Sequence, residues 1–175
     1  MTFRRFAAAV LAVGVTPAAF AQEPDLQCFA RAYSAEHLVR HPGQRVTEVM
    51  VAVGRSSEGV GGFTEAVVRA MMRDRFGEFF ANAAICVDEG GRWSCGIECD
   101  GGTFDLELAA DGTLMLRNEE YGFVLHGGCG SDVAEDRAIW LDADAEHRAF
   151  RLYPLPPEAC PRDFWLAYDR PDTVD

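Results

Sequence analysis

Apolar and polar side chains alternate between Cys86 and Arg117, in short runs separated by turns that contain glycine. Alternation with a period of two is typical of strands that bury one face. We take Gly90 and Gly91 as a two-residue hairpin loop, because such loops favour glycine at positive φ. This loop places Cys86 opposite Cys95, with their Cα atoms about 4.5 Å apart, a separation that suits a disulfide.

Two further turns continue the pattern. A two-residue loop at Gly101 and Gly102 sets Cys99 opposite Phe104, and a three-residue loop at 110–112 keeps leucines opposite leucines. The predicted meander then has one apolar face, formed by Trp93, Cys95, Ile97, Cys99, Phe104, Leu106, Leu108, Leu114 and Leu116. Because a slip of one residue would exchange the two faces, this pattern specifies the register.

The flanking segments predict one helix and more strands. A short helix begins after Ser34, which serves as its N-cap, and ends before Pro42. Residues 46–54 alternate as a strand. Residues 63–72 fit a helix or a strand, and we favour a strand paired with 79–87, where Phe79, Ala81, Ala83, Ile85 and Val87 share one face. Three short strands follow within 121–128, 138–141 and 147–154, and a proline-rich, acidic tail occupies about 154–175.

Roughly nine short strands with tight turns predict a mostly β protein with one short N-terminal helix. The expected architecture is an antiparallel meander barrel or sandwich stapled by disulfides. We favour the barrel, because a long meander otherwise leaves its edge strands exposed.

The first 21 residues have the pattern of a secretory signal peptide. Arg4 and Arg5 precede an apolar run too short to cross a bilayer, and Ala19-Phe20-Ala21 has the small-x-small pattern of a cleavage site. We therefore expect a single β-rich domain over residues 22–175 that is periplasmic or secreted, with no membrane attachment after the leader is removed.

All six cysteines lie beyond the leader, and an even number in an exported chain favours disulfides over a zinc site. Cys95 and Cys99 would lie about 13 Å apart on a strand, too far to share a metal or form a redox pair. The pairs that we expect are Cys86–Cys95, Cys28–Cys160 and Cys99–Cys129. The second pair would tie the two ends of the domain together.

The chain is acidic, with a formal charge of −12. Removal of the leader, which carries two arginines and no acidic residue, lowers this charge to −14. Nucleic acid and anionic lipid would be repelled by such a body. A basic protein or a small ligand remains as the expected partner.

His37 and His41 are the candidate metal ligands, because a spacing of four places both rings on one face of the predicted helix. A third ligand would have to come from a nearby carboxylate or from His126. A periplasmic metal-binding protein is therefore one alternative. A hydrolase with paired carboxylates is another, although no serine lies in a GxSxG motif and no catalytic residue or cofactor motif stands out.

The segment "CFARAYSAEHLVRHPGQ" resembles the opening of the mature chain in a group of small secreted bacterial proteins with no assigned activity. The matching residues are Cys28, Tyr33, His37, Leu38, His41, Pro42 and Gln44. This resemblance implies export and a shared fold, not a function. By size, acidity and disulfides the chain is also similar to periplasmic lysozyme-inhibitor barrels, although their Ser-Gly-rich inhibitory loop has no counterpart in it. Together these features favour an exported, non-catalytic binding or inhibitor-like protein.

Overall fold

The structure is a computed structural model that describes residues 26–55, 64–118, 121–126 and 138–160. The predicted leader, most of the predicted tail and Cys129 lie outside these residues.

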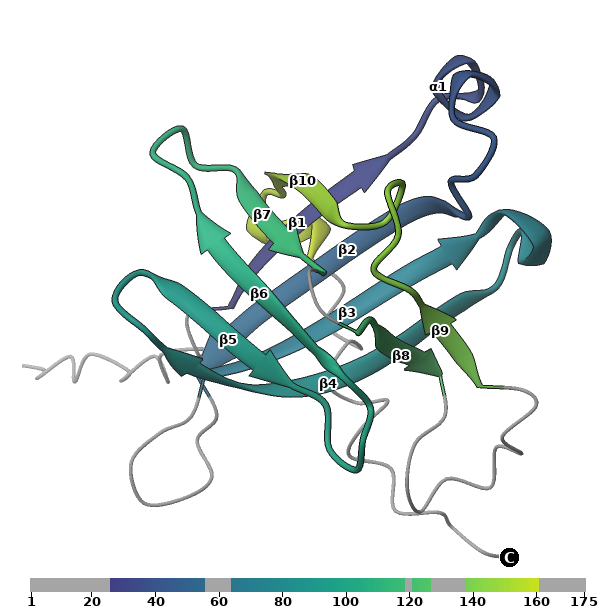
Figure 1. The fold of residues 1–175 in the computed structure, drawn as a ribbon. Coiled ribbons are helices and arrows are strands. Elements are labelled where there is room, and N and C mark those ends of the chain that lie inside the picture. The colour runs from purple at the N-terminus through teal and green to yellow at the C-terminus, as the bar shows by residue number, and fades with distance from the viewer. Residues whose placement is uncertain (1–25, 56–63, 119–120, 127–137, 161–175) are drawn as a thin grey trace, which may run out of the picture.

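Eight antiparallel strands form a closed barrel in the order β1-β10-β7-β6-β5-β4-β3-β2, so the barrel prediction is confirmed (Figure 1). The strands of its wall are β1 Gln27–Ala32, β2 Val46–Arg55, β3 Thr64–Met72, β4 Phe79–Asp88, β5 Arg92–Gly96, β6 Thr103–Leu108, β7 Leu114–Arg117 and β10 Ala149–Pro154. The helix α1, Ala35–Arg40, joins β1 to β2, and short 3-10 turns lie at Arg73–Arg75 and Pro157–Ala159. The sequence analysis missed β1. For residues 63–72 it left helix and strand open and favoured a strand, and the structure shows a strand over Thr64–Met72.

The barrel interior is filled with apolar side chains. The largest that are less than 2% exposed are Phe104, Phe123, Phe150, Met72, Leu106, Leu114, Leu116, Leu125, Leu141 and Leu152. Side chains with so little exposed area are closely surrounded by other protein atoms. Each such side chain stabilises the fold by about 1.5–3 kcal/mol relative to an exposed position.

A two-stranded sheet, β8 Phe123–His126 and β9 Ile139–Leu141, accounts for part of that filling. The amide of Asn82 on β4 donates to the carbonyl of Val124 at 3.3 Å. The Phe123 and Phe104 rings lie 5.0 Å apart. The inward positions of β3 and β4 near Asn82 carry alanines, Ala66, Ala70 and Ala84, which leave room for β8 against the wall.

The β4–β5 hairpin follows the predicted register. Cys86 lies opposite Cys95, with their Cα atoms 4.0 Å apart, and the two form a disulfide. Gly90 and Gly91 have φ of 84° and 103°, as a loop of two left-handed residues requires. The β6–β7 register is also confirmed, since Leu106 and Leu108 lie opposite Leu116 and Leu114.

The β5–β6 register differs from the prediction by four residues. Cys95, not Cys99, lies opposite Phe104. The chain turns at Cys99 and Asp100, which take φ of 59° and 60° although neither is glycine. Because a shift of four residues is even, the same side chains still face inward. The predicted apolar face is therefore buried, with three exceptions: Trp93 is half-buried, and Cys99 and Leu108 are exposed.

Gly102 is not in the tight turn that was predicted, and instead contacts a distant part of the chain. It forms a bridge to Phe123, and a Cβ atom on it would lie 2.1 Å from the carbonyl oxygen of Gly122. The neighbouring Gly101 carbonyl accepts from Val124 at 2.8 Å. The approach of β8 therefore determines where this hairpin turns.

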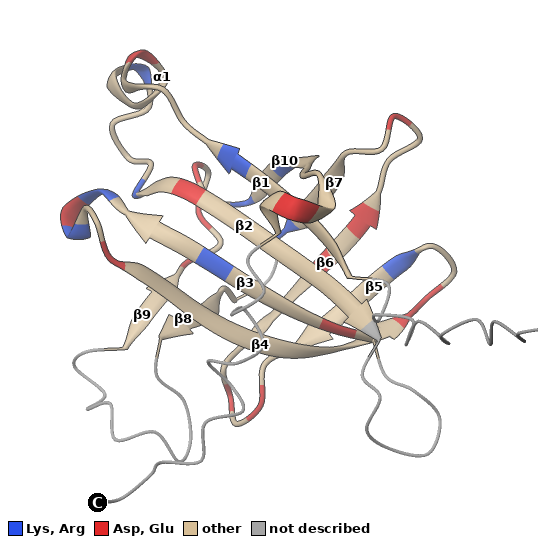
Figure 2. Ribbon diagram, turned by 180° about the vertical axis from the view of Figure 1, so that it is seen from behind, with Lys and Arg blue, Asp and Glu red and all other residues tan. Residues whose placement is uncertain are grey.

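The outward side chains of the barrel wall differ between two groups of strands, and Figure 2 shows that most positions of β2, β3 and β4 are uncharged. On β5, β6 and β7, outward side chains form ion pairs, Arg92 with Asp105 and Arg117 with Glu107. On β2, β3 and β4 most outward side chains are apolar, with Glu48, Glu65 and Arg69 as the charged exceptions. The predicted apolar alternation of β4 is thus present, but it faces outward.

Candidate functional site

His37 and His41, the candidate metal ligands, lie on α1 and at its C-cap. The helix begins because the Ser34 hydroxyl accepts the backbone N–H of His37 at 3.2 Å, which confirms the predicted N-cap. The two imidazole rings stack with centroids 4.3 Å apart and planes 19° apart. Tyr33 lies on the other side of His37, with ring centroids 4.8 Å apart.

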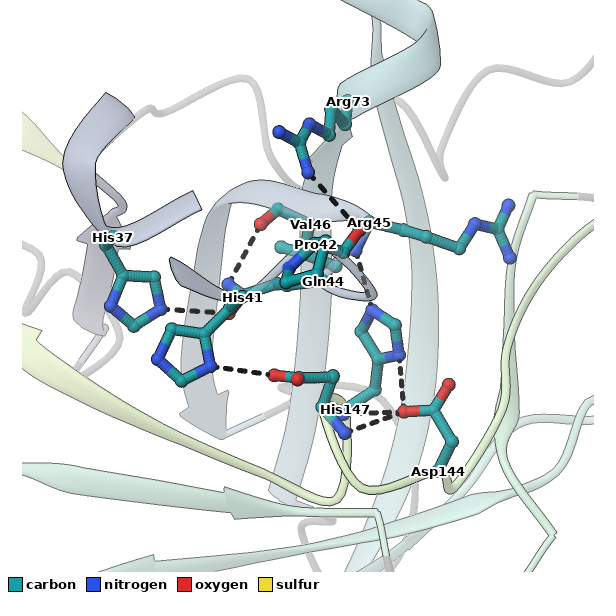
Figure 3. A network of polar contacts seen from close by, with 10 residues as sticks. His37, His41, Pro42, Gln44, Arg45, Val46, Arg73, Asp144 and His147 are labelled. Carbon is teal, nitrogen blue, oxygen red and sulfur yellow. Dashed lines mark hydrogen bonds and ion pairs between the residues drawn. The ribbon is translucent and has the colours of Figure 1, made fainter. Parts of the chain in front are cut away.

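One nitrogen of each ring has a partner within the protein (Figure 3). His37 Nε2 lies 3.0 Å from the Oε1 atom of Gln44, a carbonyl oxygen, so Nε2 is the donor. The amide of Gln44, itself buried, donates to the Val46 carbonyl at 3.0 Å. His41 Nδ1 pairs with Glu146 Oε2 at 3.1 Å. These contacts attach α1 to the start of β2 and to the turn before β10.

Among residues 26–55, 64–118, 121–126 and 138–160, the arrangement places no third metal ligand beside His37 and His41. Nearly parallel rings direct their in-plane lone pairs side by side rather than toward a common point. His126 packs against Phe80, with centroids 5.6 Å apart. In the described part of the chain, no group of three or more His, Cys, Asp or Glu side chains is placed to hold a metal ion.

His147 is the functional-looking residue that the sequence analysis missed. Its side chain is 1% exposed, and its Nδ1 lies 2.8 Å from Asp144 Oδ1 (Figure 3). Its Nε2 accepts the backbone N–H of Arg45 at 2.9 Å, which makes Nδ1 the protonated nitrogen. The pair resembles the Asp–His portion of a catalytic triad, but a backbone amide occupies the nitrogen that would act as the base. The feature of the sequence that could have indicated this pair is that Asp144 precedes His147 by three residues.

The Asp144 carboxylate is held in its charged form. Burial acts to raise its pKa, but the backbone N–H groups of Glu146 and His147, together with the His147 side chain, lower the pKa on balance. The pKa of Asp111 is also lowered, by the hydroxyl and backbone N–H of Thr113 and by Arg151. A general acid in a glycosidase needs the opposite shift.

These residues form a latch, which we define as His37, His41, Gln44, Arg45, Asp144, Glu146 and His147. It joins segments that are about a hundred residues apart in sequence. Gly43 is close-packed there, since a Cβ atom on it would lie 3.2 Å from Glu146 Cγ. Arg73 donates to the carbonyl of Pro42 at 3.3 Å. The segment that carries the resemblance therefore supplies structural contacts at this end of the barrel.

The disulfides include the pair expected at the ends of the domain. Cys28 of β1 is bonded to Cys160, with their Cα atoms 5.6 Å apart. Cys99 is also disulfide-bonded, and Cys129, its predicted partner, lies outside the described residues. None of the described cysteines is a free thiol.

The exposed apolar surface on the outside of β4 is the remaining candidate. We call Ala81, Ala83, Ile85 and Val87 the β4 stripe. Ile85 is 43% exposed and Val87 61% exposed, both large values for aliphatic side chains in the middle of a wall. Ile85 and Val87 lie opposite Gly96 and Ser94 of β5, which are too small to cover them.

None of the described helices is long and apolar enough to cross a membrane. Comparison with protein-family models, with curated proteins and with solved structures gave no match for this chain.

Proposed function

We propose that this protein is an exported, non-catalytic binding protein that holds a basic protein partner on the outside of its barrel. The observation that carries the proposal is the β4 stripe, an exposed apolar surface on a wall whose interior is already filled. Contiguous apolar surface on a folded domain is typical of contact sites for macromolecules.

The filled interior argues against a small ligand inside the barrel. Eight-stranded barrels that carry ligands keep an open cavity. Here Phe104, Phe123 and Phe150 are fully buried in that space. The partner that we propose therefore contacts the exterior.

The charge argues for a basic partner. The formal charge of −12 becomes −14 without the leader, and such a field accelerates encounter with a cation and repels other acidic molecules. Carboxylates also lie beside the stripe, since Glu65 of β3 is opposite Ile85 and Glu89 follows β4 directly. Apolar contact would supply affinity, and the surrounding carboxylates would supply orientation. If the partner is an enzyme, this contact would inhibit it.

The latch supports a non-catalytic role. Its most buried imidazole, His147, is bonded through both nitrogens to Arg45 and Asp144. An imidazole that is bonded through both nitrogens stabilises the fold and offers no free nitrogen as a base.

The test uses immobilised protein lacking residues 1–21 and the cation-exchange-retained fraction of proteins secreted by the source cells. We expect saturable capture of a defined basic protein that weakens as salt increases. The variant Ile85→Thr/Val87→Thr should lower the affinity at least about tenfold, since two buried aliphatic contacts are worth more than 1.4 kcal/mol together.

The matched control is Leu108→Thr/Val39→Thr, because Leu108 and Val39 are 45% and 75% exposed and lie outside the stripe. This control should bind as the original protein does. Equal capture by both variants, or no capture at low salt, would overturn the proposal.

A further inference from the structure

The latch contains one imidazole, that of His147, which is buried between two different partners. Its Nε2 accepts the backbone N–H of Arg45 at 2.9 Å, and its Nδ1–H donates to Asp144 Oδ1 at 2.8 Å (Figure 3). The His147 side chain is 1% exposed, whereas that of Asp144 is 53% exposed. Arg45 directly precedes β2, and His147 ends the turn before β10. This imidazole therefore joins two segments that are 102 residues apart in sequence.

A proton added to this imidazole must go to Nε2, because Nδ1 already carries a hydrogen. The new hydrogen would face the backbone N–H of Arg45, so two donors would stand 2.9 Å apart with no acceptor between them. The added charge would also lie on a side chain that hardly reaches water. Both costs oppose the charged form of His147 while the latch is closed.

The charged groups of the turn that carries His147 do not offset these costs. Asp144 is charged near neutral pH, since its pKa is lowered, but half of its side chain is exposed, so water screens its attraction for a cation. Glu146 is directed to His41, at 3.1 Å. Acid favours that pair, but both of its side chains are partly exposed, so it holds the latch only weakly. Arg148, next in the chain, is exposed.

The other elements around His147 bring positive charge or none. From the segment between α1 and β2, the Arg45 guanidinium donates to a carbonyl of β9 at 3.3 Å. From the 3-10 turn after β3, the Arg73 guanidinium donates to a carbonyl of the same α1–β2 segment at 3.3 Å. From β10, the uncharged Phe150 ring lies 6.3 Å from that of His147. None of these three described side chains would stabilise an imidazolium by charge.

We propose that the latch opens as the pH falls, because His147 can take up a proton only when its bond to Arg45 breaks. In the opened latch the imidazole reaches water, where it is half-protonated at about pH 6.5. Below that pH the opened form binds one proton more than the closed form, so acid favours opening, and above it the latch stays closed. The backbone bonds of the wall do not titrate, so α1 and its loop are released from a barrel that remains paired.

This property is independent of the proposed function, and amide hydrogen exchange of the oxidised protein tests it between about pH 7.5 and 5. We expect the protection factor of the Arg45 amide to fall about tenfold per pH unit below about pH 6.5, as the uptake of one proton requires. The reference is the amide of Ala109, which donates to the Thr113 carbonyl at 2.8 Å in the β6–β7 turn. Its protection factor should not change, because a carbonyl does not titrate in this range.

Two variants show whether His147 is the group responsible. In His147→Gln, the side-chain carbonyl can accept the Arg45 N–H in place of Nε2 and does not titrate, so the fall in protection should disappear. In the matched control His41→Gln, the buried imidazole is kept, so the fall should persist. In the unsubstituted protein, the long-range 1H–15N spectrum of His147 should show the hydrogen on Nδ1 at neutral pH, a result that does not depend on either variant folding.

Four results would overturn the inference. The first is an Arg45 amide whose protection does not change with pH, and the second is an Ala109 amide that loses protection in parallel, which would indicate unfolding of the whole domain. The third is a fall in protection that His41→Gln abolishes and His147→Gln does not. The fourth is a His147 hydrogen found on Nε2 at neutral pH, since that nitrogen could not then accept from Arg45.

Discussion

The two hairpins on either side of β5 contain glycine pairs that look alike in the sequence but act differently in the fold. At Gly90 and Gly91 both glycines are at positive φ, and a Cβ atom on either would meet nothing within 4 Å. At Gly102 the same atom would collide with the backbone of Gly122 and Phe123. Gly90 and Gly91 are required by the local backbone conformation. Gly102 is required because a distant segment, at Gly122 and Phe123, lies against its backbone. Substitutions in the two hairpins distinguish these two requirements.

The largest effect is expected from Gly102→Ala. The added Cβ atom would lie 2.1 Å from a carbonyl oxygen and 2.8 Å from a Cα atom, and backbone cannot move aside as a flexible side chain can. We expect a loss of about 3 kcal/mol or more in the free energy of unfolding, at the upper end for overpacked sites. Urea denaturation with intact disulfides measures it. A loss below about 1 kcal/mol would show that β8 does not press on this hairpin.

The next effect is expected from Cys86→Ala/Cys95→Ala. This disulfide joins residues nine apart in sequence, and a loop that short should contribute about 2–3 kcal/mol by restricting the unfolded chain. Comparing the urea midpoint of the variant with that of the oxidised protein tests this. An unchanged midpoint would mean that the hairpin loop alone keeps β4 and β5 in register.

Gly90→Ala should cost about 1 kcal/mol, the penalty of placing a Cβ atom on a left-handed residue without any collision. The same urea titration gives its value beside that of Gly102→Ala. The comparison between the hairpins fails if the two substitutions destabilise the protein equally.

The smallest effect is expected from Asp88→Ala. The Asp88 carboxylate accepts the backbone N–H groups of Gly90 and Gly91 at 2.8 and 3.0 Å, in an exposed position. Losing these bonds should cost about 0.5–1 kcal/mol, because water replaces the lost partner. Asp88→Asn keeps an acceptor oxygen and should recover part of the loss. If alanine and asparagine behave alike, the side chain does not hold the loop.

The same contrast explains how much of the fold the sequence could predict. The Cys86–Cys95 pairing followed from two adjacent glycines and a period of two, which are local properties. The β5–β6 turn could not be placed in this way, because its position depends on Gly102 meeting Phe123. The alternation in β4 correctly grouped Ile85 with Val87, but periodicity alone does not say which face of a strand is inside.

The candidate site was predictable only in part for a similar reason. The spacing of His37 and His41 correctly predicted that the two rings lie together, one on α1 and the other at its C-cap. Their partners arrive from the turn before β10, since Glu146 is 105 residues from His41. Contacts between such distant residues leave no periodic pattern in the sequence. The sequence therefore predicted two metal ligands, whereas in the structure each ring has a hydrogen-bond partner within the latch.

The pairing of β1 with β10 has a consequence for how the molecule is made. A chain synthesised from its amino end completes β1 first and β10 after the other seven strands of the wall. Until then β1 and β7 each leave a row of unpaired backbone groups open to neighbouring chains. Completion of the wall, and formation of the disulfide between Cys28 and Cys160, must therefore wait until the chain has been made as far as residue 160. The open edges of β1 and β7 are most exposed to intermolecular pairing during that interval.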